Sequence, residues 1–255
     1  MNQPLKIAVA GLGTVGVGTL KLLRKNAALL EHRCGRAIVV SAVSARQREK
    51  DRGVPLDGIR WYDDALVMAA DPEVDVIVEL IGGADGVAKA LCEAAIAASK
   101  HVVTANKALI AHHGTALAHG SEAAGVTLAY EAAVAGGIPI VKTLCEGLTA
   151  NGLSRVYGIL NGTCNFILTA MGDSGREFAE VLEEARALGY AEADPSLDVD
   201  GVDTAHKLAI LASLAFGCEV NFAAVHIEGI RHVTLMDIRF AEELGYRIKL
   251  LGIAG

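Results

Sequence analysis

Short apolar runs and amphipathic stretches alternate along the first half of the chain. The run Lys6–Ala10 is short, β-branched and apolar, and the stretch Val15–Asn26 places Val17, Leu20 and Leu23 at helical spacing. Such a run is typical of a buried strand, and a repeat of about 3.6 residues is typical of a helix. The chain is therefore predicted to open with a strand, a turn and a helix.

The same alternation continues to the middle of the chain. Further strands are predicted at Ile38–Val43, Val74–Leu80, His101–Thr104 and Val126–Tyr130, and helices at Asp64–Ala70, Val87–Ser99 and Leu109–Ala124. Strands that alternate with helices form a parallel sheet with helices packed on both faces. We therefore expect an α/β fold with a doubly wound parallel sheet over residues 1–133.

The pattern changes after Tyr130, where a glycine-rich passage begins. Helices are predicted at Val141–Leu148, Thr163–Met171, Glu177–Leu188 and Asp203–Phe216, and strands at Leu153–Leu160, Ile227–Ile230 and Ile248–Ile253. Gly217 follows the last of these helices and is expected to close it as a C-terminal cap. Residues 134–255 are therefore expected to form a second α+β domain with a mixed sheet.

Charge and cysteine content limit the partners and the compartment. The formal net charge of -7 argues against nucleic acid or an anionic membrane as partner, because an acidic surface is repelled by both. The apolar run before Gly11 is too short for a signal peptide or a membrane span. The 5 Cys form no CxxC pair, which indicates reduced thiols in a cytoplasmic protein.

A glycine motif, Gly11-Leu-Gly13-Thr14-Val15-Gly16, lies between the first strand and the first helix. The first glycine permits a tight turn, the second lets a pyrophosphate approach the backbone, and the third lets helix and strand pack closely. Phosphates then bind the helix N-terminus, where N–H groups and the macrodipole favour anions. A glycine-rich turn without a ligand is the alternative, but the strand before and the helix after favour a Rossmann-type dinucleotide site.

The end of the second strand bears on the choice between NADP and NAD. Residues 41–46 lack the Asp or Glu that binds the ribose hydroxyls of NAD, and Arg46 stands there instead. A guanidinium binds a 2′-phosphate well, so we expect NADP, with Ser44 as a second contact and NAD as the alternative. Arg46 can equally be a solvated residue of the charged run that follows. Gly82, Thr104 and Lys107, near later strand ends, complete the cofactor-binding candidates.

Five further motifs together resemble the homoserine dehydrogenase family. They are TANKA at 104–108, YEAAVAGGIPI at 130–140, NGTCN at 161–165, GYAEADP at 189–195 and DVDGVDTAHK at 198–207. The motifs run in the family's order, and the resemblance covers essentially the whole chain. The resemblance implies hydride transfer between a nicotinamide dinucleotide and the L-homoserine and L-aspartate 4-semialdehyde pair, a step in threonine, methionine and isoleucine biosynthesis.

Reduction of an aldehyde requires a proton donor, and a lysine ammonium both donates a proton and stabilises developing negative charge. Lys207 follows Asp203 by four residues on one predicted helix, so the carboxylate can hold the ammonium in place. An ordinary surface ion pair is the alternative. The resemblance implies that Lys207 is the proton donor, that Asp203 and Glu192 bind the substrate's amino group, and that Lys107 positions the reactants.

Asp198 is a second-rank substrate-binding candidate. Both Asp198 and Asp200 precede the predicted Lys207 helix, and capping of its N-terminus is the commonest use of Asp at such a place.

The resemblance implies further properties that the residues alone do not. It places a monovalent cation, sodium, on Glu131, Val134, Gly136 and Ile138, mostly through backbone oxygens, while an interdomain hinge is the competing interpretation. It implies a homodimer that pairs through the sheet of the second domain. It also implies that the polypeptide of relatives runs on past residues 249–255, so we expect the C-terminus to be incomplete relative to the family.

Two alternatives come from other functional classes. Cys164 invites the hypothesis of an aldehyde dehydrogenase that uses a cysteine nucleophile, although a buried structural cysteine fits its position equally well. A dinucleotide-binding sensor or remnant without turnover is the other, because a fold does not by itself imply an activity.

Overall fold

The structure, a computed structural model, describes residues 3–255, and the chain divides into two compact units, residues 1–141 and 142–255. The boundary expected at residues 133 and 134 lies within the first unit, in the glycine-rich passage. Within the described residues, no helix combines the length and the apolar character that crossing a membrane requires.

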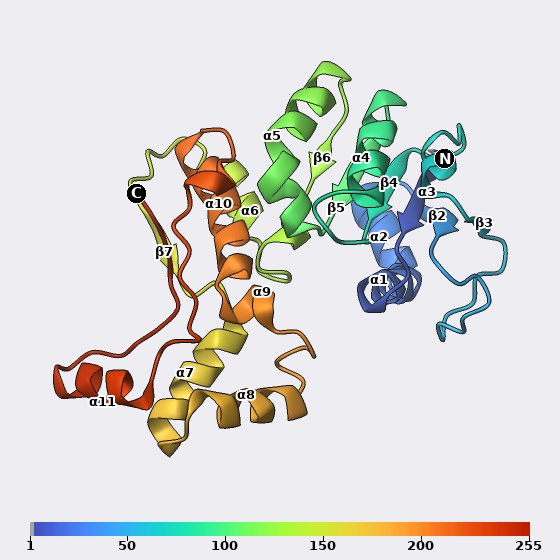
Figure 1. Ribbon diagram of the computed structural model, residues 1–255. Helices are drawn as coiled ribbons and strands as arrows, with labels where there is room; N and C mark the ends of the chain where they lie inside the picture. The colour runs from blue at the N-terminus through green and yellow to red at the C-terminus, as the bar shows by residue number, and fades with distance from the viewer. Residues whose placement is uncertain (1–2) are drawn as a thin grey trace. The chain divides into compact units, whose positions relative to one another are not determined.

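The first unit is built on a parallel sheet of six strands in the order β3-β2-β1-β4-β5-β6 (Figure 1). The strands are β1 Leu5–Ala10, β2 Ile38–Ser44, β3 Arg60–Tyr62, β4 Val76–Glu79, β5 His101–Thr104 and β6 Leu128–Ala129. The chain begins in β1, extends the sheet to one side through β2 and β3, and then crosses to β4 on the other side. In sheets with such a reversal, ligands usually bind in the crevice outside the carboxyl ends of the two strands that flank it, here β1 and β4.

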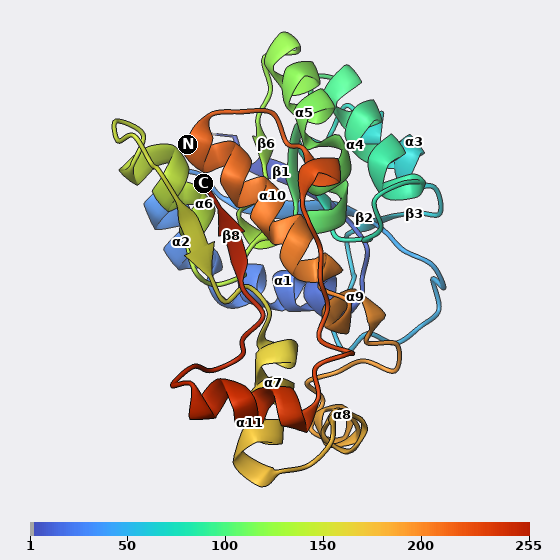
Figure 2. The ribbon, with the colours of Figure 1, turned by 60° about the vertical axis from the view of Figure 1, so that its left-hand side comes forward.

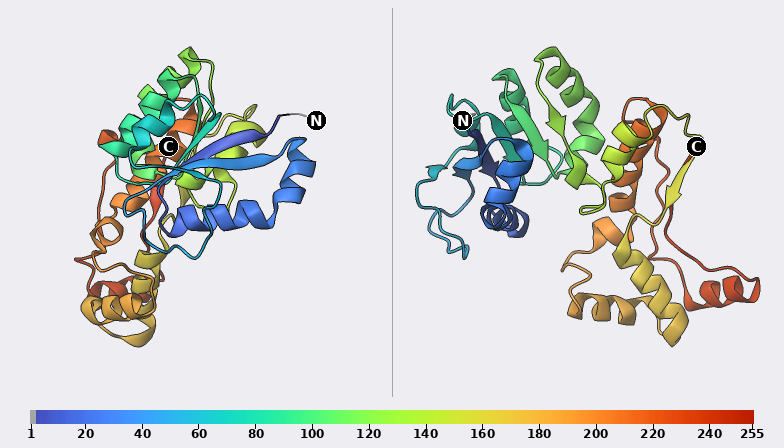
Figure 3. Two further views of the ribbon diagram at one scale, coloured as in Figure 1. Left: turned by 90° about the vertical axis from the view of Figure 1, so that its right-hand side faces the viewer. Right: turned by 180° about the vertical axis from the view of Figure 1, so that it is seen from behind.

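Helices cover both faces of this sheet, and the predicted doubly wound fold is confirmed (Figure 3). The helices of the first unit are α1 Thr14–Lys25, α2 Ala27–Cys34, α3 Ala65–Ala69, α4 Val87–Ala97 and α5 Lys107–Ala123. Alternate strand residues point to opposite faces, so Ala8 packs into the core under α3 and α4, whereas Val9 packs with Leu20 of α1. The sheet is thus packed between two hydrophobic clusters, one on each face.

The second unit contains a helical cluster and a small sheet (Figure 2). Helix α6 Ile140–Lys142 spans the boundary between the units, and the main elements of the second unit are β7 Val156–Gly158, α7 Gly162–Ser174, α8 Phe178–Ala187, α9 Ser196–Val199, α10 Val202–Phe216, α11 Leu235–Glu243 and β8 Gly252–Ala254. Strands β7 and β8 pair antiparallel, and α10 packs against them. Helix α10 ends at Gly217, which adopts the left-handed conformation (φ 64°), as predicted.

The small sheet differs from the predicted mixed sheet in its extent. Residues Ile227–Ile230 form no strand, because the Ile230 N–H donates to the Val199 carbonyl at 2.8 Å and binds this segment to α9. Leu250 lies outside β8, because its N–H and C=O bond the side-chain amide of Asn165 at 3.1 and 3.0 Å. Side-chain and loop partners replace strand pairing at both places.

Candidate functional site

The glycine turn after β1 has the geometry that the motif predicts. Gly11 adopts φ +96°, and a Cβ there would lie 2.3 Å from the Leu80 carbonyl oxygen. A Cβ on Gly16 would lie 2.0 Å from the Gly11 carbonyl oxygen, so helix and turn meet without room for a side chain. Gly13 caps α1 without a side-chain hydrogen bond, and the first turn carries no acidic residue. The helix N-terminus therefore suits an anionic group.

The end of β2 places Ser44 and Arg46 beside this turn. The Ser44 carbonyl accepts a hydrogen bond from the Gly11 N–H at 2.8 Å, and the Ser44 residue is buried. Arg46 is exposed at the start of a loop. Arg52 stabilises this loop, because the Arg52 guanidinium donates to the carbonyls of Arg46 and Gln47, each at 2.8 Å. Arg52 also lies over the Trp61 ring, with 5.2 Å to the centroid. Arg46 thus stands on an ordered turn, two residues after the end of β2.

The other side of the crevice is formed by the ends of β4 and β5. Gly82 follows β4 with φ +88°, and Lys107 is the half-buried first residue of α5. Thr104 is fully buried, and its hydroxyl donates to a carboxylate oxygen of Glu79 at 2.5 Å. The side chain of Thr104 therefore serves the protein interior, and any contact it makes with a cofactor goes through its backbone. Sequence reasoning missed Glu79, although a carboxylate at the end of an apolar run was a visible signal.

The second unit brings Lys207, Asp203 and Asp198 together. Lys207 Nζ donates to Asp203 Oδ2 at 2.7 Å and to the Leu160 carbonyl at 2.7 Å. The Asn161 amide donates to Asp198 Oδ1 at 2.7 Å and to Asp203 Oδ2 at 2.9 Å. The side chains of Lys207 and Asp203 are 19% and 6% exposed, so this is a largely buried pair rather than a solvated surface pair. Sequence reasoning quoted Asn161 in a motif but gave it no role.

These groups line a hollow of about 470 Å³ in the second unit. Its walls are formed by Asn161, Gly162, Thr163, Phe166, Tyr190, Asp198, Asp203 and Lys207. Phe166 and Tyr190 meet edge to face, with ring centroids 4.9 Å apart, and add aromatic surface to the lining. A hollow of this size with a few convergent polar groups is typical of a small-molecule site.

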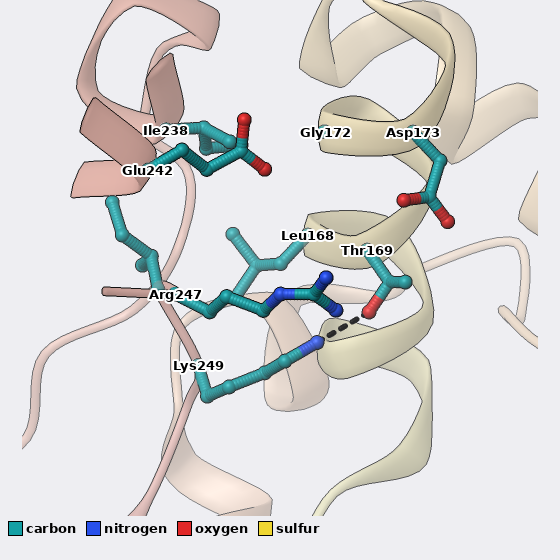
Figure 4. Close-up of a pocket in the computed structure, with 9 residues that line it drawn as sticks. Leu168, Thr169, Gly172, Asp173, Ile238, Glu242, Arg247 and Lys249 are labelled. Atoms are coloured by element: carbon teal, nitrogen blue, oxygen red, sulfur yellow. Dashed lines mark hydrogen bonds between the residues drawn. The ribbon is translucent and has the colours of Figure 1, made fainter. Parts of the chain in front are cut away.

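A second hollow between α7 and α11 is much smaller, about 20 Å³ (Figure 4). Charged side chains point into it from both sides, and Lys249 donates to the Thr169 hydroxyl. A space of this size holds about one water molecule. None of the residues predicted for the site lines it, so it is no candidate for substrate binding.

Two sequence interpretations change in the second unit. Glu192 is exposed on the segment between α8 and α9 and does not line the 470 Å³ hollow. The capping interpretation of Asp198 and Asp200 is wrong, because Gly201, in the left-handed conformation, precedes α10 and no side chain caps that helix. Asp198 instead faces Asn161, and Asp200 pairs with Arg231.

Cys164 lies under the same hollow but is unsuited to be a nucleophile. It is buried at the start of α7, and its Sγ donates to the Asp198 carbonyl at 3.1 Å. Burial, followed by the negative charges of Asp198, Asp203 and Asp200, raises the pKa of Cys164 to about 12. The thiol is therefore protonated at neutral pH, and the thiolate that attacks a carbonyl is scarce.

The passage predicted to hold a cation forms a compact turn in the first unit. Positive φ values at Ala135 (49°) and Gly137 (91°) fold the backbone back, and the Glu131 carboxylate accepts from the Val141 N–H at 3.2 Å. Val134 is buried. Among the described residues, no three His, Cys, Asp or Glu side chains are grouped to hold a metal, so a cation here would rely on backbone oxygens.

Comparison with known proteins identifies relatives of both units. Residues 139–254 match the family model for homoserine dehydrogenase, and residues 11–131 match the model for its NAD binding domain. The chain is 50% identical to the homoserine dehydrogenase of Pseudomonas aeruginosa, over 99% of this chain and 57% of that protein.

Solved structures agree with these matches. A homoserine dehydrogenase from Thiobacillus denitrificans is 50% identical, with a TM-score of 0.94 over 99% of this chain and 58% of that one. A putative homoserine dehydrogenase from Archaeoglobus fulgidus is 33% identical, with a TM-score of 0.86 over 98% of this chain and 80% of that one. The chain spans a little over half the length of the curated relatives it matches, 57% for the Pseudomonas aeruginosa protein.

Proposed function

The chain belongs to the homoserine dehydrogenase family, and from that premise we propose that it interconverts L-homoserine and L-aspartate 4-semialdehyde with a nicotinamide dinucleotide. The observation that carries the proposal is the hydrogen-bonded group of Lys207, Asp203, Asn161 and Asp198 in the wall of the 470 Å³ hollow. This group combines a proton donor with carboxylates that suit a cationic amino group. It therefore matches an amino-acid aldehyde as substrate.

Lys207 is the proposed proton donor. An ammonium group has three N–H donors, and two of them bond Asp203 and Leu160 in the part of the chain that the structure describes. The third is available to the aldehyde oxygen, where it stabilises the negative charge that develops when the carbonyl carbon is reduced. Lys207 Nζ then gives its proton to the alkoxide and recovers one from solvent. In the opposite direction the neutral amine accepts the hydroxyl proton of homoserine.

Asp198 and Asp203 are the proposed partners of the substrate's ammonium group. Asn161 donates to both carboxylates and keeps them oriented, and their negative charges suit the substrate's ammonium group. Glu192 is retained as a third partner, because it lies two residues after Tyr190, which lines the hollow.

The first unit is proposed to bind NADP, with NAD as the alternative. The nicotinamide supplies and accepts the hydride when the dinucleotide is bound. Gly11, Gly13 and Gly16, with Thr14 and Val15 at the helix start, would hold the pyrophosphate: Gly11 and Gly16 permit the tight turn, and Gly13 has open space where a Cβ would stand. Arg46 and Ser44 would bind the 2′-phosphate end. Gly82, Thr104 and Lys107 would lie at the nicotinamide end, where the Lys107 charge helps to position the reactants.

We also infer a sodium ion at the turn formed by residues 131–138. The Glu131 carboxylate and the carbonyls of Val134, Gly136 and Ile138 form an all-oxygen donor set of the kind that hard cations prefer. The left-handed residues of the turn support this inference, because they bend the backbone so that successive carbonyls can converge.

The protein is further proposed to be a cytoplasmic homodimer. The outer face of the β7–β8 sheet is apolar and exposed, with Tyr157 73% and Ile253 60% accessible and opposite each other in register. A second copy of this sheet would cover that face. The five cysteines are all free, which fits a reducing compartment.

Turnover of L-aspartate 4-semialdehyde tests the proposed reaction. NADPH oxidation is followed by absorbance for the parent protein and for Lys207→Ala, with Lys249→Ala as the control for loss of a lysine elsewhere in the same unit. We expect Lys207→Ala to lower kcat by about 10²-fold or more and to leave NADPH binding unchanged. A parent protein that binds NADPH without turnover would instead support a non-catalytic dinucleotide binder.

A further inference from the structure

Glu79 is an acidic residue without exposed surface at the carboxyl end of β4. A carboxylate is rarely buried completely unless its oxygens are satisfied. Here Oε1 accepts from the N–H groups of Ile81 and Gly82 at 2.7 and 3.1 Å, and Oε2 accepts from the Thr104 hydroxyl at 2.5 Å. Three donors from two neighbouring strand ends therefore converge on one side chain.

The segment that Glu79 holds is a tight glycine turn. Gly82 and Gly83 adopt φ values of +88° and +84°, a conformation that L side chains rarely adopt. A Cβ built on Gly82 meets nothing within 4 Å, so the backbone there faces open space. The turn would therefore present bare backbone to a ligand.

Asn106 fixes the same turn from the other strand. Its Nδ2 donates to the Gly83 carbonyl at 2.7 Å, and its backbone N–H donates to Thr104 Oγ1 at 3.0 Å. Its Oδ1 accepts from the Leu109 N–H at 3.1 Å and so caps α5, which begins at Lys107. One network of buried polar groups thus connects the turn after β4 with the start of α5.

This network lies directly beside the glycine turn that is proposed to hold the pyrophosphate. The Leu80 N–H donates to the Ala10 carbonyl at 2.8 Å, and the missing side chain of Gly11 leaves room for the Leu80 carbonyl. Because β4 and β5 continue the sheet away from β2 and Arg46, the half of a dinucleotide that reaches the network is the nicotinamide half.

We propose that Glu79 is a positioning residue that holds the backbone turn at residues 81–83 against the nicotinamide riboside half of the dinucleotide. The inference rests on the proposed dinucleotide binding and adds a residue to it. Glu79 acts through the turn and through Thr104 and Asn106, and it touches neither substrate nor cofactor. Its loss therefore affects the nicotinamide half of the ligand and spares the adenosine half.

Binding of NADPH and of 2′,5′-ADP, measured by titration calorimetry, tests this inference. The second ligand carries the adenosine and the 2′-phosphate but lacks the nicotinamide riboside. Glu79→Gln replaces one of the two accepting oxygens by an amide NH₂ group. A donor of the side chain then faces a donor of its former partner, and both are buried. We expect NADPH binding to weaken about tenfold, as for loss of a hydrogen bond to a charged group, and 2′,5′-ADP binding to stay within about twofold of the parent.

Asp71→Asn is the matched control. Asp71 is also a buried carboxylate of the first unit, bonded to the Tyr62 hydroxyl at 2.8 Å, but it precedes β4 at the opposite end of the sheet. We expect this variant to have the same ratio of affinities for NADPH and 2′,5′-ADP as the parent. If Glu79→Gln does not fold, Thr104→Val removes the same hydroxyl donor, and Thr104→Ser should restore the parent affinities.

The outcomes separate this inference from the proposed function. If the parent binds NADPH and the Glu79→Gln variant binds both ligands as tightly as the parent does, the role of Glu79 is overturned and the dinucleotide proposal stands. An equal loss of affinity for both ligands in a folded Glu79→Gln protein also overturns the role of Glu79, because the effect would not be confined to the nicotinamide half. A parent that binds neither ligand overturns the dinucleotide proposal and this inference together.

Discussion

A single amide side chain, Asn161, organises the charged wall of the proposed substrate site. Its Nδ2 group donates to Asp198 and Asp203, and its Oδ1 accepts from the Cys164 N–H at 2.8 Å as the cap of α7. Two carboxylates that share a site repel each other, and a donor between them reduces this repulsion. Asn161 therefore both begins a helix and keeps two like charges together.

Asn161→Ala removes all three hydrogen bonds. We expect the free energy of unfolding to fall by about 2–4 kcal/mol, because a helix cap is lost and two carboxylates, of which Asp203 is buried, lose a shared donor. We also expect kcat/KM for L-aspartate 4-semialdehyde to fall, since Asp203 would no longer hold Lys207 in a fixed position. Urea denaturation and steady-state kinetics measure the two effects.

Asn151→Ala serves as the control, because the Asn151 side chain is exposed and makes one long hydrogen bond of 3.5 Å to Leu148. Equal stability changes in Asn161→Ala and Asn151→Ala would contradict the role given to Asn161.

The elements with a regular hydrophobic period are predictable from the sequence, and those fixed by distant contacts are not. Strands β1, β2, β4, β5 and β6 and helix α10 follow from local patterns of apolar residues, whereas β3, a strand of three residues, was not predicted. The pairing of Lys207 with Asp203 follows likewise from helical spacing. Asn161, in contrast, bonds partners 37 and 42 positions away, which no local pattern indicates.

Helix α11 was not predicted from the sequence, and the segment 227–230 was predicted as a strand that does not form. Helix α11 begins with a capping box between Thr234 and Asp237, a local signal that the sequence did offer. The segment 227–230 has the β-branched composition of a strand, yet it packs on α9 through Gly229 and Ile230. Tertiary contacts decided its conformation, as is common for short apolar runs.

Gly229→Ala tests that packing. A Cβ on Gly229 would lie 2.4 Å from the Val199 carbonyl oxygen and 2.6 Å from the Asp200 Cα, so the segment must move away from α9. We expect the free energy of unfolding to fall by about 1–3 kcal/mol, the usual cost of overpacking. We also expect a lower kcat/KM, because α9 carries Asp198 into the hollow. The measurements are urea denaturation and steady-state kinetics.

Gly152→Ala is the matched control, because a Cβ on Gly152 meets nothing within 4 Å. If both alanine variants are equally stable, the close approach of Gly229 to α9 does not constrain the fold.

At the scale of the whole molecule, the small sheet of the second unit has one covered face and one bare face. Gly252 and Ala254 of β8 face α10, whereas Tyr157 and Ile253 project from the other side. A two-stranded sheet has marginal stability by itself and gains from a covered face. The apolar side chains on the bare face therefore favour association of two copies through this sheet.

Ile253→Lys tests this association. A lysine on the outer face of the sheet would bring two like charges into the interface of a symmetric dimer, where neither is paired, and burial of an unpaired charge is costly. We expect light scattering to give the mass of a dimer for the parent and that of one chain for the variant. Met236→Lys is the control, because Met236 is similarly exposed, at 64%, but lies on α11. A parent of single-chain mass, or an Ile253→Lys protein that remains a dimer, would show that this face does not join two copies. Loss of the dimer in Ile253→Lys but not in Met236→Lys would assign the dimer interface to the β7–β8 sheet, since both variants add the same charge to the same unit.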